Sequence, residues 1–232
     1  MGPCPARECI RAEAGVDGTE LRYVARIAEI HIELPDLIRT QPAFIDDRLI
    51  GEGSDIMLDI CRFKRLLDHF PHEVYEQYEI GKLTDHEFFR AMKDALPQPN
   101  CLKEDDFWRG WNKLIVAETE TVGLLPIFKN SYKVYLLSNT NPKHIKHVVE
   151  EKFSFQNNVH KAFYSFDLGC KKPDEAIYLK ALKLAGTKPE ESLLIDDMEE
   201  NVAQARNVGF HTIHYHDHKS TVDALRIMNL LN

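Results

Sequence analysis

The chain has 232 residues, of which 44% are hydrophobic and 28% are charged, so it can bury a substantial core like an ordinary globular protein. Its formal net charge of -8 argues against a nucleic-acid-binding protein, which needs a basic surface, and against binding to an anionic membrane. A chain of 232 residues is long for one minimal domain and short for two, which favours a main domain with a modest insertion.

The cysteines are scattered along the chain, and none of them forms a Cys-x-x-Cys pair. This pattern predicts no disulfide framework and favours a reducing compartment. The N-terminal residues lack the continuous apolar stretch of a signal peptide, and no run of about 18 apolar residues occurs anywhere in the chain. We therefore expect a soluble, cytoplasmic protein without nucleic-acid or membrane partners.

The first two segments of the chain differ sharply in their patterning. Residues 1–26 show little periodicity and contain several prolines and glycines, so we expect a poorly ordered leader. Residues 51–118 are rich in helical patterns and contain no predicted strand, so we expect them to form a helical unit. Within it, Thr84 and Glu87 form a capping-box pattern that predicts the start of a helix. Further along, Phe107, Trp108 and Trp111 have the spacing of a packed helix face.

A row of acidic residues lies in the same helical segment. Glu73, Glu76 and Glu79 follow one another at the spacing of a helix surface. We expect them to form an exposed face, because glutamates are rarely buried unless they are paired.

Residues 119–232 alternate between predicted strands and helices. The expected strands are Val134–Leu137, Ala162–Phe166, Leu193–Ile195 and Thr212–Tyr215, and the expected helices are Pro142–Val149, Asp174–Ala185 and Glu199–Asn207. Strands that alternate with helices predict a parallel sheet with helices on both faces, which is an α/β doubly wound fold. We assign residues 27–50 and 119–232 to this core domain.

Polar residues follow three of these strands at the point where each strand ends. Ser138 and Asn139 follow the first strand, Lys172 lies before a proline after the second, and Asp196 and Asp197 end the third. In parallel sheets, ligands bind at the carboxyl ends of the strands. A hydroxyl with backbone amides and a lysine suits a phosphate group, and paired carboxylates suit Mg²⁺.

The segments LLSNTNP, GCKKPDEAIY and LLIDDMEENVAQARNVGF resemble the second, third and fourth motifs of the haloacid dehalogenase-like hydrolases, in the family's order and spacing. The subgroup that they resemble contains sugar-phosphate phosphatases and the N-terminal domain of epoxide hydrolases. The resemblance implies a Rossmann-like core, a helical cap inserted over residues 51–118, and Mg²⁺-dependent transfer of a phosphoryl group from a small phosphorylated metabolite to an aspartate.

The resemblance also implies roles for individual residues. Ser138, Asn139 and Lys172 would bind the phosphoryl group, with Asn139 and Asn201 as orienting groups. Asp197 would bind the metal directly, and Asp196 would be its neighbour or support.

The family's first motif, which carries the nucleophilic aspartate after the first strand, has no clean copy in this chain. Asp17 has a glycine where the nucleophile should stand, and Asp46 and Asp47 follow only a short apolar run. Asp36 is the choice by spacing, as the catalytic aspartate and a third metal ligand, because its separation from Ser138 matches the capped subgroup. Ile38 nevertheless replaces the aspartate or glycine that the family carries two positions later.

Three functional hypotheses follow from these patterns. The first is an Mg²⁺-dependent phosphatase that acts on small phosphomonoesters through an aspartyl-phosphate. The second is a catalytically inactive protein of the same fold that binds partners, because the first motif is degenerate. The third is dehalogenation. This reaction needs no metal, so the paired acids Asp196 and Asp197 argue against it.

Overall fold

The structure is a computed structural model that describes residues 23–25, 71–96, 99–112, 120–153 and 155–231. In this part of the chain, one five-stranded parallel sheet has the strand order β3-β2-β1-β4-β5. The strands are β1 (Tyr23–Ala25), β2 (Lys133–Ser138), β3 (Lys161–Tyr164), β4 (Ser192–Asp196) and β5 (His211–His214). The predicted α/β fold with a parallel sheet is therefore confirmed.

The central strand comes from an unexpected part of the sequence. β1 lies between β2 and β4, with Val24 opposite Val134 on one side and Leu193 on the other. Tyr23–Ala25 fall within the segment 1–26 that was expected to be a leader, so these three residues belong to the sheet instead. Because the strands are parallel, the carboxyl end of β1 points to the same edge as those of β2 and β4.

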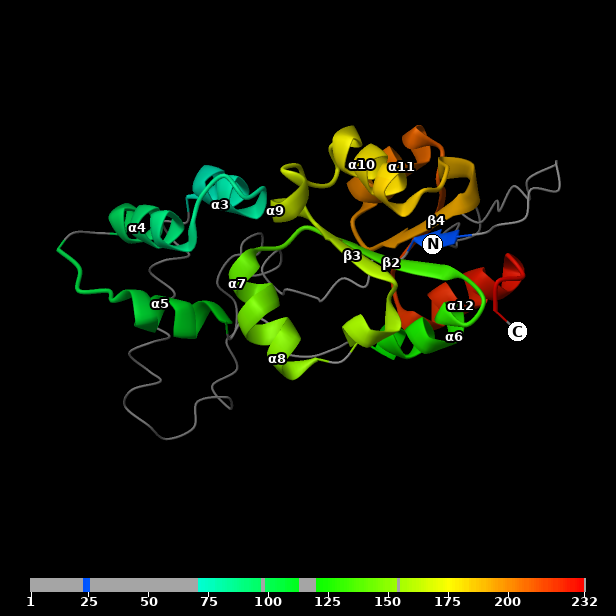
Figure 1. Ribbon diagram of the computed structural model, residues 1–232, viewed down its shortest axis with the longest axis horizontal. Helices are drawn as coiled ribbons and strands as arrows, with labels where there is room; N and C mark the ends of the chain where they lie inside the picture. Colours follow the sequence, from blue (N-terminus) through cyan, green and yellow to red (C-terminus); the bar gives the residue numbers. More distant parts are fainter. Residues whose placement is uncertain (1–22, 26–70, 97–98, 113–119, 154, 232) are drawn as a thin grey trace, which may run out of the picture.

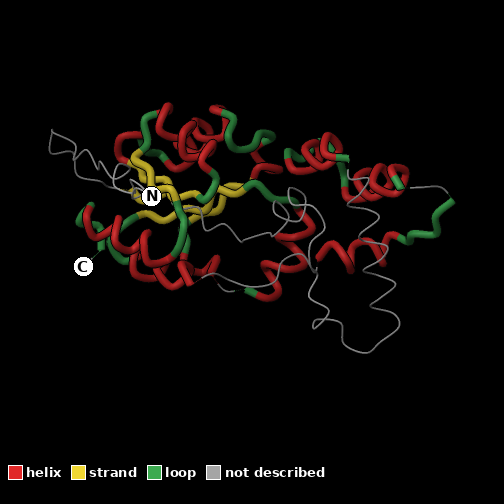
Figure 2. The backbone as a smooth tube through the Cα atoms, turned by 180° about the vertical axis from the view of Figure 1, so that it is seen from behind, coloured by secondary structure: helices red, strands yellow, loops and turns green. Residues whose placement is uncertain are grey.

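Helices cover both faces of the sheet, as expected (Figure 1). α10 (Glu175–Ala185) and α11 (Glu199–Val208) lie on one face, and α6 (Leu125–Lys129) and α12 (His218–Ile227) lie on the other. The view from behind shows the same sandwich of helix, sheet and helix (Figure 2). The shorter helical segments are η3 (Glu120–Leu124), α7 (Pro142–His144), η4 (Ile145–Val149), α8 (Glu150–Lys152), η5 (Phe155–Asn158), α9 (Ser165–Leu168) and η6 (Pro189–Glu191).

The alternation of side chains along β4 builds two separate cores. Leu193 and Ile195 pack with Phe128 of α6 on one face, whereas Leu194 packs with Ile177 of α10 on the other. Successive residues of a strand point to opposite faces, so a strand covered on both sides must be apolar throughout. This explains the Leu-Leu-Ile run that made β4 recognisable from the sequence.

One strand prediction was wrong at its carboxyl end. Ala162–Phe166 was expected to be extended, but β3 ends at Tyr164, opposite Ser138, the last residue of β2. The residues that follow form α9, which ends at Gly169 in the left-handed conformation with φ of 67°. Beyond the end of β2 the backbone of β3 has no strand to pair with on that side, so the chain turns into a helix.

Three further helices, α3 (His72–Glu79), α4 (Asp85–Ala95) and α5 (Glu104–Trp111), lie beyond the carboxyl edge of the sheet (Figure 1). We call these three helices the cap. The predicted capping box is confirmed, because Thr84 and Glu87 bond reciprocally at the start of α4. The helices bury their own aromatic cluster: Tyr78, Phe88, Phe89, Phe107, Trp108 and Trp111. The boundaries 51–118 of an inserted cap remain a prediction, since residues 51–70 lie outside the described residues.

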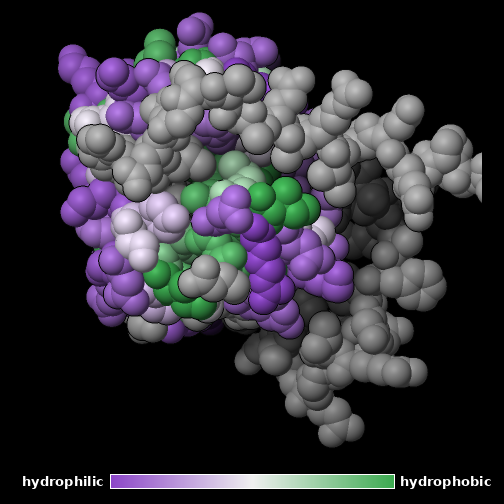
Figure 3. All heavy atoms as spheres, turned by 90° about the vertical axis from the view of Figure 1, so that its right-hand side faces the viewer, coloured by the Kyte–Doolittle hydropathy of each residue, from purple (hydrophilic) through white to green (hydrophobic). Residues whose placement is uncertain are grey.

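The opposite end of the core is shown in Figure 3, where apolar side chains are framed by hydrophilic ones. The strands begin toward this end, and their polar carboxyl ends point away from it, toward the cap (Figure 1). Among the described helices, none combines the length and the apolar character that crossing a membrane would require.

Candidate active site

The carboxyl ends of β2, β3 and β4 bring the predicted polar residues to one edge of the sheet. Ser138 is opposite Tyr164 in the pairing of β2 with β3, and Asp196 ends β4 opposite His214. Lys172 reaches this edge from the loop between α9 and α10. Residues more than thirty positions apart in sequence, such as Asn139 and Lys172, are in direct contact there.

Asn139 ties the end of β2 to the lysine loop. Its side-chain amide donates to the carbonyl oxygen of Lys172 at 2.9 Å, and its Oδ1 accepts from the backbone N–H of Lys172 at 2.8 Å. Both ends of the Asn139 amide are therefore engaged, which supports an orienting role for this side chain. Ser138, directly before it, is 8% exposed.

The next two residues tie the same segment to α9 and α7. The Ser165 hydroxyl accepts from the backbone N–H of Thr140 at 3.0 Å and donates to its carbonyl oxygen at 3.1 Å. Asn141 caps α7 by accepting from the backbone N–H of His144 at 3.0 Å. The side chains of Asn139 and Asn141 and the backbone of Thr140 therefore fasten the end of β2 to three different neighbours.

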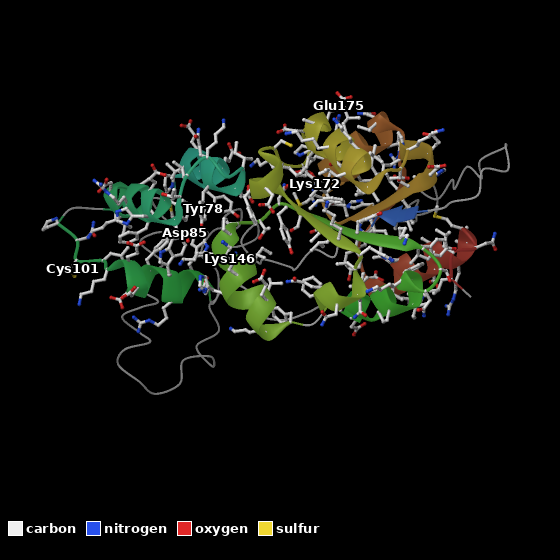
Figure 4. All side chains as sticks on the ribbon, viewed as in Figure 1. Tyr78, Asp85, Cys101, Lys146, Lys172 and Glu175 are labelled. Carbon is white, nitrogen blue, oxygen red and sulfur yellow. The ribbon has the colours of Figure 1, made fainter. Side chains whose placement is uncertain are left out.

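Lys172 and Asp196 form a completely buried ion pair at the centre of this edge. The Lys172 Nζ lies 2.8 Å from Asp196 Oδ2, and both side chains are 0% exposed. Burial lowers the pKa of Lys172, and the carboxylate of Asp196 acts against that shift. Figure 4 places Lys172 at the base of α10, next to the end of the sheet.

Asp196 is held on its other side as well. Its Oδ1 accepts from the backbone N–H of Met198 and from the side-chain amide of Asn201, both at 2.9 Å. Tyr178 supports this arrangement by donating its hydroxyl to the carbonyl oxygen of Asn201 at 3.0 Å. Both oxygens of Asp196 therefore have protein partners, which fits the predicted supporting role.

Asp197 is in the opposite situation. Its Oδ1 is buried and has no hydrogen-bond partner among the described residues. Burial raises the pKa of Asp197. The backbone is fixed by His214, whose Nε2 donates to the Asp197 carbonyl oxygen at 2.8 Å. A buried carboxylate oxygen without a donor is a ligand that a hard cation such as Mg²⁺ would satisfy.

The structure places Ser138, Asn139, Lys172, Asp196 and Asp197 at one edge of the sheet, where Lys172 contacts both Asn139 and Asp196. Asp36 and the other candidates for the first motif lie outside the described residues. Within the described ranges, no group of three or more His, Cys, Asp or Glu side chains is arranged to hold a metal ion. A complete metal site would therefore need a ligand from elsewhere in the chain or from the substrate.

Several residues of this edge were not predicted: Asn141, His144, Ser165, Tyr178 and His214. Asn141 had a local signal, since an asparagine directly before a proline is typical of a helix N-cap. His144 bonds Asn141 of its own helix and the distant Trp111. Ser165, Tyr178 and His214 contact residues at least 17 positions away, and nothing in their neighbours indicates this.

His144 links the site to the cap and is neutral. Its Nε2 lies 3.0 Å from the Trp111 carbonyl oxygen, which can only accept, so Nε2 carries the hydrogen. Its Nδ1, 3.0 Å from the Asn141 Nδ2, is then the acceptor for that amide. The ring is buried, and burial lowers the pKa of His144 to about 4.

We expect His144 to make the fold sensitive to acid. The pKa is lower in the folded than in the unfolded chain, so this contribution to stability is complete above pH about 6.5 and is lost as the pH falls toward 4. The loss between pH 7 and pH 4 amounts to about 3 kcal/mol. Urea unfolding across this range should show a shallower pH dependence in His144→Gln than in the wild type. His216→Gln, a change of an exposed histidine, should leave the dependence unaltered, and an equal effect of both changes would contradict the assignment.

Comparison with known proteins supplies a family for this site. The sequence model of the haloacid dehalogenase-like hydrolases matches residues 72–209. The D-ribitol-5-phosphate phosphatase of Bacteroides thetaiotaomicron is 29% identical over 147 residues, which span 60% of this chain and 69% of that protein. A sesquiterpene phosphatase of Aspergillus oryzae is 27% identical over 155 residues, spanning 66% of this chain and 78% of that protein.

Solved structures show the same fold. A haloacid dehalogenase family enzyme of Bacteroides thetaiotaomicron, crystallised with magnesium and inorganic phosphate, matches with a TM-score of 0.62 and 25% identity. The match covers 73% of this chain and 88% of that structure. A protein of Porphyromonas gingivalis that is described as a predicted haloacid dehalogenase-like hydrolase matches with a TM-score of 0.63 and 24% identity, over 75% of this chain and 90% of that structure.

Proposed function

Since this chain belongs to the haloacid dehalogenase-like hydrolase family, we propose that it is an Mg²⁺-dependent phosphatase of small phosphomonoesters. The observation that carries the proposal is the contrast between the two neighbouring aspartates. Asp196 is saturated by protein donors, whereas Asp197 keeps a buried oxygen without a partner. This is the arrangement expected where a carboxylate serves a bound cation beside a fixed lysine. Named phosphatases among the relatives support the same class of reaction.

Each residue of the edge has a role in this proposal. Asp197 would hold Mg²⁺, which when bound offsets negative charge on the phosphoryl oxygens. Lys172 contributes a positive charge whose position is set by Asp196 and by the backbone bonds to Asn139. Ser138 donates its hydroxyl to a phosphoryl oxygen at the end of β2.

The reaction itself needs a nucleophile, for which we propose Asp36. A carboxylate oxygen attacks phosphorus, the bond from phosphorus to the ester oxygen breaks, and the ester oxygen leaves as an alkoxide that takes a proton from water to give the alcohol. Water then hydrolyses the acyl phosphate, releasing inorganic phosphate and restoring the carboxylate. β1 supports a nucleophile from the front of the chain, because its carboxyl end points to the edge that carries Ser138 and Asp196.

For the part of the substrate that carries the phosphoryl group, we propose only that it is a small metabolite. The relatives are named for ribitol phosphate and for a sesquiterpene, which differ widely in polarity. A catalytically inactive binding protein is not favoured, since the three described strand ends retain their complete set of polar groups.

Turnover of p-nitrophenyl phosphate tests the proposal directly. We expect release of phosphate that requires Mg²⁺ and stops when EDTA removes the metal. Asp36→Asn should abolish turnover, while Asp17→Asn, Asp46→Asn and Asp47→Asn should retain it. Loss in one of those variants, with Asp36→Asn active, would move the nucleophile to that residue. Absence of turnover on p-nitrophenyl phosphate and on a panel of sugar phosphates would favour the inactive alternative.

A further inference from the structure

Each core loop that carries a proposed phosphate ligand also carries a lysine that reaches the cap. Lys171 directly precedes Lys172, and Lys143 lies in α7, shortly after Ser138. Both lysines pair with acidic residues of the cap helices. The cap is therefore joined by opposite charges to the same two loops that would bind phosphate.

The contact at Lys171 is largely buried. Its Nζ lies 3.0 Å from Glu76 Oε1 and 3.3 Å from Glu79 Oε2, and the Glu79 side chain is only 9% exposed. The expectation that Glu76 and Glu79 form an exposed helix face is therefore wrong for Glu79. Its partner is 92 residues away in the sequence, so no local pattern indicated the pair.

The free energies of burial and of attraction nearly balance in this contact, so the contact can form and break reversibly. Burial raises the pKa of Glu79, while Lys171 and a hydrogen bond from Tyr75 act in the opposite direction. Removing two charges from water is costly, and the attraction between them offsets that cost only in good geometry. If α3 moves away, both charges regain water, so the net free energy of this contact is small.

The contact at Lys143 is the second link. Its Nζ lies 3.5 Å from Asp85 Oδ2 and 5.0 Å from the centre of the Trp108 ring. Tyr78 fixes the same carboxylate by donating its hydroxyl to Asp85 Oδ1 at 2.8 Å. Figure 4 shows Tyr78 and Asp85 in the part of the cap that lies next to α7.

A close backbone approach accompanies these charges. Gly81, just after α3, has φ of 71°, and a Cβ placed there would lie 2.3 Å from the Phe166 carbonyl oxygen of α9. Only glycine fits such a position without a shift of backbone. α3 therefore packs directly against the segment that leads to Lys171 and Lys172.

We propose that Glu79 with Lys171 and Asp85 with Lys143 are positioning pairs that dock the cap and thereby set the two phosphate-binding loops in their working geometry. The catalytic consequence of this proposal rests on the proposed function, whereas the docking of the cap does not. Lys171 and Lys172 share a peptide bond, and Asn139 bonds the backbone of Lys172, so a shift at Lys171 reaches both loops.

A double-mutant cycle on the buried pair tests this proposal. We expect Glu79→Gln and Lys171→Met each to lower kcat for p-nitrophenyl phosphate about tenfold, which corresponds to about 1.4 kcal/mol and lies within the range of interaction energies between contacting residues. The double variant should fall no further than Lys171→Met, because that variant already removes the contact of Lys171 with Glu79 as well as its contact with Glu76. Glu73→Gln, an exposed glutamate of the same helix, should leave kcat unchanged. Additive losses, or unchanged kcat with a lowered unfolding midpoint, would reduce the pair to a structural contact and overturn the proposal.

Tryptophan fluorescence gives a readout of docking that needs no catalysis. The chain has two tryptophans, and both lie at this junction, with Lys143 over Trp108 and His144 stacked on Trp111 at 5.5 Å. Acrylamide should quench their emission more strongly in Lys171→Met and Glu79→Gln than in the wild type or Glu73→Gln. Gly81→Ala places a Cβ against the Phe166 carbonyl oxygen, so it supplies the quenching expected of a protein with an undocked cap. Unchanged quenching in both single variants would overturn the proposal even if the enzyme is active, and increased quenching would support docking even if no substrate is turned over.

Discussion

Asp197→Asn should abolish phosphatase turnover and leave the fold intact. The carboxylate oxygen that has no donor in the described part of the chain is the group that would hold Mg²⁺, and metal catalysis of this kind contributes several kcal/mol to transition-state stabilisation. We therefore expect kcat/KM for p-nitrophenyl phosphate to fall about a thousandfold. The free energy of unfolding should be unchanged or higher, because burial raises the pKa of Asp197 and a neutral amide removes the cost of a buried charge.

The control for this variant is Asp167→Asn, which changes an exposed aspartate of α9 close to the same loop. Activity and stability should both stay at the wild-type level in that protein. Isothermal titration with Mg²⁺ would separate binding from chemistry, and heat of binding should be lost in Asp197→Asn alone. Retention of more than a tenth of the activity by Asp197→Asn would remove this residue from the metal site.

Lys172→Met should damage stability and activity together. The change leaves the Asp196 carboxylate buried without its cation, and breaking a buried pair in this way costs about 3 to 5 kcal/mol. Asp196 keeps its bonds to Met198 and Asn201, so we expect the lower end of this range. Urea unfolding measures the loss, and Lys183→Met, an exposed lysine of α10, is the matched control.

A second variant separates the two effects. In Lys172→Met with Asp196→Asn, no unpaired charge remains, so most of the stability should return while turnover stays absent. Stability that stays low in the double variant would mean that the packing of Lys172, and not the charge of Asp196, dominates. Activity that returns with stability would show that Lys172 is not needed for the transfer of phosphate.

Much of the fold could be predicted because the relevant forces are local in the sequence. β2 and β4 are covered on both faces, so they must be continuous apolar runs, and the polar residues after them mark the edge where parallel strands end. Ser138, Lys172, Asp196 and Asp197 could be named for that reason. Gly209 could also be named as a helix stop, and it has φ of 106° at the end of α11.

Other features of the structure had no local pattern in the sequence that could have predicted them. β1 is three residues long, and its central place is decided by pairing with β2 and β4 on either side. Glu79 has the spacing of a surface residue, yet it is buried because Lys171 meets it there. His144 is held between Asn141 of its own helix and the Trp111 carbonyl of the cap.

The sequence by itself thus determined the class of fold, the edge of the sheet at which we propose the active site and the types of residue that stand there. Only the tertiary structure decided which charges are paired and which carboxylate oxygen of the paired acids lacks a donor among the described residues. The physical reason is that apolar periodicity and helix capping depend on near neighbours, whereas the cost of burying a charge depends on a partner that can lie anywhere in the chain.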